Sequence, residues 1–484
     1  MMSEFSEYLD YYMEENGISV AALSRETGIE RTLVYRYRKG NRTPVNEETV
    51  LRIVNGLRMN AMEKRRLLEK YDCLNIGEYE VKSYKYVKKL LKRLKETGRP
   101  SVSGMLHWGA SLNSYFQESF FFIHSQDEIN ACISAMFAQV KEEGDELFLV
   151  MQPVYDSVQK MIPQFFRNSE IRIEQIVCLE QGFSKSYKNL EIFQSVLPLC
   201  FEPMRYCVRY YYDFLKNHIN IMSWMPNILI AGKYVIQFNF EMDNGVFIKD
   251  AKYAEMMKQQ FLKMKEKTSS FLSGSEDGMG VLDVYDMSDQ SYDTCMFEQP
   301  CLGLGLSSDL YEEFLYPFPE KDAFIKKMAE LSGDWDDMKF IPPPGKADSF
   351  RFFCKVETIR RFMETGRGNE FSSAFYKPLS MDARKKVLLR LIQAVRNDLL
   401  TINTLPDWIE IPSHLFFYWS EKNKAMSVKC MTGNGLSHVF VQEPGIYQVF
   451  QGFFEYLEKK NLLAGKEEVL QEMEKIRKEY WQVV

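Results

Sequence analysis

The chain has 484 residues, of which 45% are hydrophobic and 26% charged, and its net charge is −6. This length and composition predict a soluble, well-cored protein of two to four domains. No run of about 18 apolar residues is present, which excludes a membrane-spanning helix. The acidic N-terminus, MMSEFSEYLDYY, lacks the basic and apolar blocks of a signal peptide. Nine scattered cysteines without a C-x-x-C pair indicate reduced thiols and no zinc site, so we expect a cytoplasmic protein.

Charge is unevenly distributed along the chain. Residues 1–99 carry 20 Lys and Arg against 15 Asp and Glu, a net charge of +5, whereas the remainder has a net charge of −11. A basic end on an acidic body is typical of a protein that touches nucleic acid at one end. Mildly acidic bodies are common in cytoplasmic proteins, so the charge pattern serves only as support.

Residues 18–44 have the pattern of two short helices joined by a tight turn. Ser19 predicts the N-cap of a helix over 20–27, and Gly28, which can adopt a positive φ, predicts its end. A second helix is predicted over 30–39, with Val34 and Tyr37 on its buried face. Gly40 ends that helix, and a basic loop leads into a third amphipathic helix near 50–57.

A small residue, a glycine and an aliphatic residue (Ser24, Gly28 and Val34) stand at the spacing that helix-turn-helix packing requires. Here the chain resembles the Xre family, the Cro and lambda-repressor-like DNA-binding domains. The resemblance covers roughly residues 3–72 and is most specific from Gly28 to Pro44. Family members often begin the first motif helix with a glutamine that contacts the DNA backbone, and the chain has Val20 in that place.

This resemblance implies that residues 30–39 are the recognition helix, whose N-terminal residues enter the major groove. Arg31, Thr32 and Arg36 are the predicted base readers, because arginine can pair bidentately with guanine. The predicted phosphate contacts are the neighbouring residues Tyr35, Arg38, Lys39 and Arg42. The alternative is a solvated basic face on an ordinary small helical domain.

Residues 78–96 predict a connecting helix. Tyr84, Val87, Leu91 and Leu94 form its apolar stripe, and lysines cover much of the rest. Such a helix could add phosphate contacts or help to pair two chains. The alternative is a solvated linker helix.

From about residue 103 the sequence alternates between helical and strand patterns, which predicts an α/β unit. Strands are predicted at 146–152, 171–179, 206–212, 228–231, 234–240 and 245–249, and helices at 127–140, 155–166, 189–199 and 251–265. Residues 268–294 are polar and rich in Gly, Ser and Asp, which predicts a surface connection.

An internal repeat divides the body. Residues 246–264 and 439–457 align without gaps as a strand end, an acidic residue (Asp250 or Glu443) and a helix with a shared phenylalanine (Phe261 or Phe454). An earlier helix also matches, at 189–199 and 382–397. We interpret the repeat as a duplication, with generic strand-turn-helix similarity as the alternative. Asp250 and Glu443 are predicted to cap their helices.

Two similar α/β halves resemble, more weakly, the phospholipase-D-like fold, in which the halves pack about a pseudo-twofold axis. The catalytic members of that family carry H-x-K-x(4)-D in each half. None of the five histidines, at 107, 124, 218, 414 and 438, has a lysine two residues on. We therefore expect no catalytic residues, no metal ion and no cofactor, and a non-catalytic sensory or dimerisation module.

The expected fold class is α+β multidomain, an all-α helix-turn-helix domain followed by a duplicated α/β body. The expected domains are a DNA-binding domain at 1–72, a basic linker helix at 73–102, a first half at 103–275, a connection at 276–305 and a second half at 306–484.

The function expected from these features is that of a sequence-specific transcriptional regulator or repressor, acting as a homodimer on double-stranded DNA. Its effector would be a small molecule, a peptide or a protein, at residues that the sequence does not identify. The alternatives are a DNA-recruited nuclease or phosphodiesterase-like enzyme of a defence or mobile-element system, and a partner-controlled repressor or antitoxin.

Overall fold

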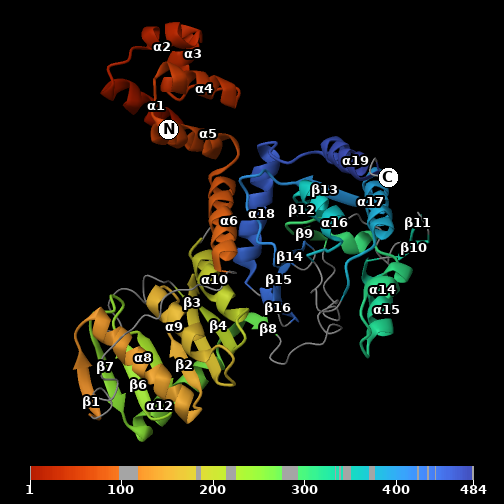
Figure 1. Cartoon of the computed structure of the whole chain (residues 1–484). Coiled ribbons are helices and arrows are strands. Elements are labelled where there is room, and N and C mark those ends of the chain that lie inside the picture. The colour runs from red at the N-terminus through yellow and green to blue at the C-terminus, as the bar shows by residue number, and fades with distance from the viewer. Residues whose placement is uncertain are drawn as a thin grey trace. The chain divides into compact units, whose positions relative to one another are not determined.

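The computed structural model of the chain (Figure 1) describes residues 2–97, 118–180, 187–213, 225–274, 293–332, 334–336, 339–341, 350–369, 376–421, 424–432, 435–441 and 443–481. The chain forms two compact units. The first unit contains Met1–Val87 and Val449–Leu462, and the second contains Lys88–Gln448 and Leu463–Val484. This division is coarser than the five expected domains, whose boundaries stay predictions.

The first unit is helical, and its elements follow the predicted pattern. They are α1 (Glu4–Glu15), α2 (Val20–Thr27), α3 (Arg31–Arg38), α4 (Glu47–Gly56), α5 (Ala61–Asn75) and the first half of α6 (Glu78–Thr97). The Ser19 side chain caps α2 by accepting from the Ala22 amide, and Gly28 ends α2 with φ of 64°. Val34 and Tyr37 are buried in its core, as predicted, together with Leu23.

Gly56, in the last turn of α4, allows α4 to pack closely on α2. A Cβ there would lie 2.5 Å from Thr27 Cγ2 and 3.1 Å from Leu23 Cδ1. Alanine gains about 1 kcal/mol of helix propensity over glycine, but overpacking costs typically 1–3 kcal/mol. We expect Gly56→Ala to lower the stability of the first unit, measured by hydrogen exchange of residues 20–56. Asn55→Ala on the exposed face of the same helix is the control and should leave stability unchanged or slightly raised; a stabilised Gly56→Ala variant would contradict the close approach.

The second unit contains one large mixed sheet built from both halves of the body. The first half supplies β1 (Phe120–Ile123), β2 (Leu147–Val150), β3 (Arg172–Glu180), β4 (Arg205–Asp213), β5 (Asn227–Ala231), β6 (Tyr234–Phe238) and β7 (Gly245–Lys249). Its helices are α8 (Gln126–Glu143), α9 (Asp156–Phe166), α10 (Tyr187–Cys200) and α12 (Ala251–Lys265). The predicted strands and helices of this half are all present.

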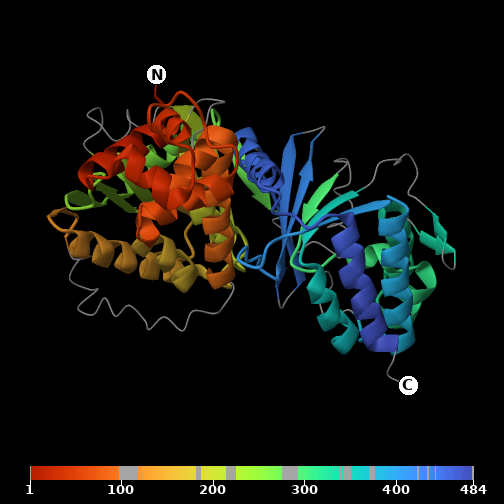
Figure 2. The same cartoon turned by 90° about the horizontal axis from the view of Figure 1, so that it is seen from above.

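The second half supplies β9 (Thr294–Met296), β12 (Phe350–Cys354), β13 (Leu400–Thr404), β14 (Leu415–Ser420), β15 (Ala425–Thr432) and β16 (Gly435–Val441). Its helices are α14 (Ser308–Phe314), α15 (Lys321–Ser332), α16 (Ile359–Thr365), α17 (Met381–Arg396), α18 (Pro444–Lys459) and α19 (Lys466–Trp481). Short 3₁₀ turns at Leu302–Gly305 and Val356–Thr358 and a small hairpin, β10 (Asp334–Asp336) with β11 (Lys339–Ile341), complete it. Figure 2 shows α17 and α19 running side by side over this half.

The strand order of the two halves confirms the predicted duplication. It reads β7-β6-β5-β2-β3-β4 in the first half and β16-β15-β14-β9-β12-β13 in the second. In each half the first three strands form an antiparallel meander, and the last three are parallel to one another. The helix after each outer strand begins in the same way, because Asp250 accepts from the Tyr253 amide at 2.8 Å and Glu443 from the Ile446 amide at 2.8 Å. Both carboxylates therefore cap their helices as predicted.

The predicted surface connection over 268–294 is wrong at its start. Residues Ser269–Gly274 form β8, which pairs with β4 of the first half and β16 of the second. Phe271 and Leu272 are buried there, so two apolar residues anchor an otherwise polar stretch inside the sheet. Residues 275–292 lie outside the described part of the chain.

All nine cysteines lie among the described residues and are free thiols. Within the described part of the chain, no helix combines the length and the apolar character needed to span a membrane.

Candidate nucleic-acid interface

The turn between α2 and α3 is fixed by side-chain hydrogen bonds that set the direction of α3. Ser24 Oγ donates to the Ile29 carbonyl oxygen at 2.7 Å, and Thr27 Oγ1 donates to that of Leu23 at 2.7 Å. Arg52 of α4 donates from Nε to the Thr27 carbonyl oxygen at 3.0 Å. The carbonyl group of Thr27, the last residue of α2, therefore has a partner, and hydrogen bonds on both sides of Gly28 fix the turn that leads into α3.

The outer face of α3 presents the predicted base readers together. Arg31, Thr32, Tyr35 and Arg36 are all exposed, whereas Val34 on the opposite face is buried. Among the described residues these four side chains make no hydrogen bond or ion pair. Two guanidinium groups, a hydroxyl and a phenol are therefore free to contact a ligand.

Arg38 and Lys39, two of the predicted phosphate contacts, have acidic partners within the first unit. Arg38 ion-pairs with Asp10 and, at 2.7 Å, with Glu14, and Lys39 Nζ lies 3.2 Å from Asp10. Burial alone would raise the pKa of Asp10, but its hydrogen bonds to Arg38 and Lys39 lower that pKa below its usual value. The phosphate roles of Arg38 and Lys39 stay predictions, and DNA would have to compete with the carboxylates of α1 for both cations.

Arg42 is exposed in the loop that follows α3. This loop is held at its far end, because Tyr71 Oη of α5 donates to the Pro44 carbonyl oxygen at 3.3 Å and Asn46 caps α4 through the Thr49 amide. Tyr71 is itself buried beneath the loop. The loop that carries Arg42 is therefore positioned from α5.

Val20 occupies the place where family members often have a glutamine. It is half-buried and packs against the core of the first unit. The contact that the glutamine makes with the DNA backbone cannot be made by valine, so the backbone contacts of this domain must come from other residues.

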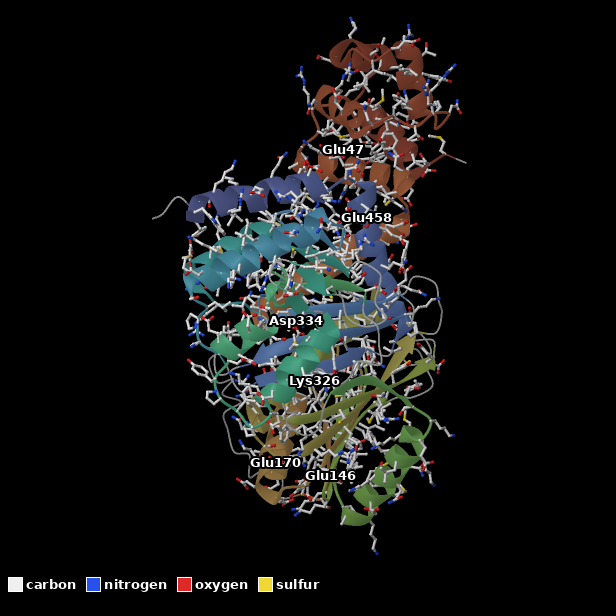
Figure 3. The ribbon with its side chains drawn as sticks, turned by 90° about the vertical axis from the view of Figure 1, so that its right-hand side faces the viewer. Glu47, Glu146, Glu170, Lys326, Asp334 and Glu458 are labelled. Carbon is white, nitrogen blue, oxygen red and sulfur yellow. The ribbon has the colours of Figure 1, made fainter. Side chains whose placement is uncertain are left out.

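The sequence did not predict the contribution of Val449–Leu462 to this unit, which we call the 449–462 segment. Figure 1 shows α18 alongside α6, and Tyr84 of α6 stacks on Tyr456 with ring centroids 4.3 Å apart. Lys460 Nζ lies 2.7 Å from Asp72 of α5 and 2.5 Å from Glu47 of α4. Figure 3 labels Glu47 on α4 and Glu458 in the last turn of α18, both members of the first unit.

Asp72 and Lys460 form a nearly buried ion pair. Their side chains are 11% and 16% exposed, and Tyr456 Oη donates to Asp72 at 3.2 Å. Burial raises the pKa of Asp72, although the hydrogen bond from Lys460 acts to lower it. Burial alone would lower the pKa of Lys460, but its bonds to Asp72 and Glu47 outweigh burial and raise that pKa. Both groups are therefore held by one another rather than by water.

The sequence allowed α6 to be a solvated linker helix. This alternative is wrong, because the apolar face of α6 is buried. Val81, Val87, Leu90, Leu91 and Leu94 are buried. Several of its lysines pair with carboxylates, for example Lys82 with Glu78 of the same helix. The helix is a packed element.

The sequence of the second unit contains no H-x-K motif. Of the five histidines of the chain, His107 and His218 lie outside the described residues. His414 is largely buried, and this burial lowers its pKa. Glu443 is 4% exposed and accepts from Tyr212 Oη of β4 at 3.1 Å. Burial raises the pKa of Glu443, against the hydrogen bonds of the Gly445 and Ile446 amides and of Tyr212.

Comparison with known proteins identifies the type of domain to which α2 and α3 belong. Residues 8–61 match the model of the Cro/C1-type helix-turn-helix DNA-binding domain. The match includes α2, the Gly28 turn and α3, so this part of the chain is a DNA-binding domain of that type. A comparison of the whole chain with characterised proteins gives no match.

Two solved structures share weak similarity with the chain. One is TrmBL2, described as an archaeal chromatin protein with a novel mode of DNA binding, at 15% identity over 43% of this chain and 71% of that chain, with a TM-score of 0.21. The other is a phosphatidylserine synthase of Haemophilus influenzae Rd KW20, at 10% identity over 75% of this chain and 92% of that chain, with a TM-score of 0.22. At these scores neither similarity carries an argument about the body.

Proposed function

We propose that the protein is a sequence-specific DNA-binding transcriptional regulator that acts in the cytoplasm. The observation that carries the proposal is the exposed face of α3, where Arg31, Thr32 and Arg36 stand together without partners among the described residues. In a domain of this type that helix enters the major groove, where arginine and threonine read base edges. Tyr35 and Arg42 beside them would bind phosphate.

Two chains would pair, so that two recognition helices read half-sites about one helical turn apart. The duplicated α/β body would hold the dimer or sense a small-molecule, peptide or protein effector, without catalysis. The absence of H-x-K from the sequence supports the non-catalytic role. An effector would change DNA binding only if it bound the DNA-competent arrangement differently from the other arrangement.

The direct test is a selection of bound sequences from random duplex DNA with the purified full chain. A palindromic motif recovered by the wild type and lost by the variant carrying Arg31→Ala and Arg36→Ala is the expected result. Recovery of random DNA with a steep salt dependence would indicate phosphate-driven binding and would contradict the base-reading roles.

Two further assays with the purified full chain test the two alternative functions. Cleavage of labelled DNA in the presence of divalent metal ions would favour the recruited nuclease. A stoichiometric partner in the purified protein would favour the partner-controlled repressor or antitoxin.

A further inference from the structure

The 449–462 segment completes the first unit from a distant part of the sequence. Its contact with α6 is close, because a Cβ added at Gly452 would lie 2.8 Å from both Ser83 Oγ and Tyr79 Cε1. Lys459 adds a bond to the Ile76 carbonyl oxygen at 3.1 Å and an ion pair with Glu80 at 2.5 Å. The segment therefore holds the end of α5, the start of α6 and, through Lys460, the start of α4.

The duplication shows that this surface is special to the second copy. Gly452, Phe453 and Tyr456 align with Gln259, Gln260 and Lys263 of α12. In α12 the first two of these are exposed, and its last turns carry the surface pattern of an ordinary outer helix. The corresponding positions of α18 hold a glycine and two aromatic residues in place of these polar residues, as a packing surface requires.

The contacts lead from the segment to the loop that carries Arg42. Lys460 binds Asp72 in α5 and Glu47 in the first turn of α4, and Tyr71, next to Asp72, holds Pro44 in that loop. The segment therefore contacts α5 and the start of α4, the two elements that position the loop. Lys460 itself is only 16% exposed, so its ammonium group is directed to the two carboxylates.

The other end of α18 is fixed in the second unit. Glu443 caps the helix through the Ile446 amide at 2.8 Å and receives the Tyr212 hydroxyl of β4 at 3.1 Å. One helix therefore begins on residues of both body halves and ends among residues of the first unit.

We propose that Lys460 and Tyr456 are positioning residues for DNA binding, which brace α5 and the start of α4 and thereby hold the loop of Arg42. This inference rests on the proposed function. Lys460 acts through Asp72 and Glu47 and does not touch DNA. The contact with α5 is made by the protein's own 449–462 segment and requires no external ligand.

Lys460→Met in the full chain is the first test. It leaves Asp72 nearly buried without its cation, and a carboxylate in that position is strongly unfavourable. We expect DNA affinity to fall on the order of tenfold, within the range of coupled sites. The salt dependence of binding should stay as in the wild type, because no phosphate contact is lost. A salt slope lower by about 1 would mean that Lys460 binds phosphate directly and would overturn the proposal.

Two further variants separate positioning from simple loss of fold. The double variant Lys460→Met with Asp72→Asn removes the uncompensated charge and should regain most of the affinity, since removing both partners of a buried pair is far milder than removing one. Tyr456→Phe keeps the ring stack on Tyr84 and should give a smaller loss in the same direction. A double variant no better than the single one would contradict the role of the Asp72 pair.

The matched control is Lys466→Met, which breaks an ion pair of 2.6 Å with Asp398 in the second unit and should leave affinity unchanged. Hydrogen exchange of residues 41–56 makes the inference testable apart from DNA binding. Exchange there should be faster in Lys460→Met, restored in the double variant and unchanged in the control. If the wild type bound no duplex DNA, the proposed function would be wrong, but hydrogen exchange would still test whether Lys460 braces α5 and the start of α4. Unchanged exchange in Lys460→Met would show that it does not.

Discussion

Replacing Phe453 by alanine is expected to lower the free energy of unfolding of the first unit by about 3–5 kcal/mol, the usual cost of removing a buried phenylalanine. Phe453 is fully buried, and its ring lies parallel to that of Tyr84 at 6.0 Å and edge-on to that of Phe454 at 5.3 Å. Alanine leaves the place of the ring next to Tyr84 empty, and the cavity adds to the loss of buried apolar surface.

The chain offers separate probes for the two units. All six tryptophans lie outside Met1–Val87 and Val449–Leu462, so tryptophan fluorescence reports on the second unit alone. Hydrogen exchange of peptides from residues 4–87 reports on the first. In Phe453→Ala we expect faster exchange in the first unit at denaturant concentrations where the fluorescence is still native.

The control is Gln260→Ala, which changes the aligned position of the duplicated helix α12. Gln260 is exposed, and surface substitutions of this kind usually change stability by less than about 0.5 kcal/mol. Equal effects of the two variants would mean that the 449–462 segment is not part of the core of the first unit.

The variant that lacks both Arg31 and Arg36 is expected to lose roughly 2–6 kcal/mol of binding free energy for its selected site, because a bidentate arginine–guanine pair is worth about 1–3 kcal/mol. The loss on a scrambled duplex should be much smaller, since only the charge attraction is reduced there. Equilibrium titrations at several salt concentrations, on the selected and the scrambled duplex, measure both quantities.

Arg42→Ala is the contrasting variant for this prediction. A residue that binds phosphate weakens binding uniformly across sequences and lowers the salt slope by about 1. We expect that behaviour from Arg42, which stands in the loop after α3 and not on its outer face. If Arg31 and Arg36 behaved like Arg42, their assignment as base readers would be wrong.

The helix-turn-helix could be predicted from the sequence because its determinants are local. Ser19, Gly28, Val34 and Tyr37 act within a few residues of one another, and each has the predicted place in the structure. The duplication was also accessible, because two copies can be compared by alignment alone. The aligned acids, Asp250 and Glu443, proved to make the same cap at the same spacing.

The features that were missed depend on contacts between distant residues. The polar strand β8 is held in the sheet by pairing on both sides, for which its sequence, SSFLSG, gives only Phe271 and Leu272 as a signal. The 449–462 segment has more apolar positions than its counterpart in α12, which signals a second contact surface without naming its partner. Likewise, the engagement of Arg38 with Asp10 follows from the packing of α1 on α3, which spacing alone does not reveal.

The composition of the first unit also has a consequence for synthesis on the ribosome. Residues 1–87 emerge early, but the segment that covers α5 and α6 begins at Val449. At about 5–20 residues per second, the intervening chain takes roughly 20–70 s to make. During that time the apolar faces of α5 and α6 lack their final cover, and Asp72 lacks the ammonium group that neutralises it. A chain released before residue 462 would carry the recognition helix without the contacts that Lys460 makes to Asp72 and Glu47.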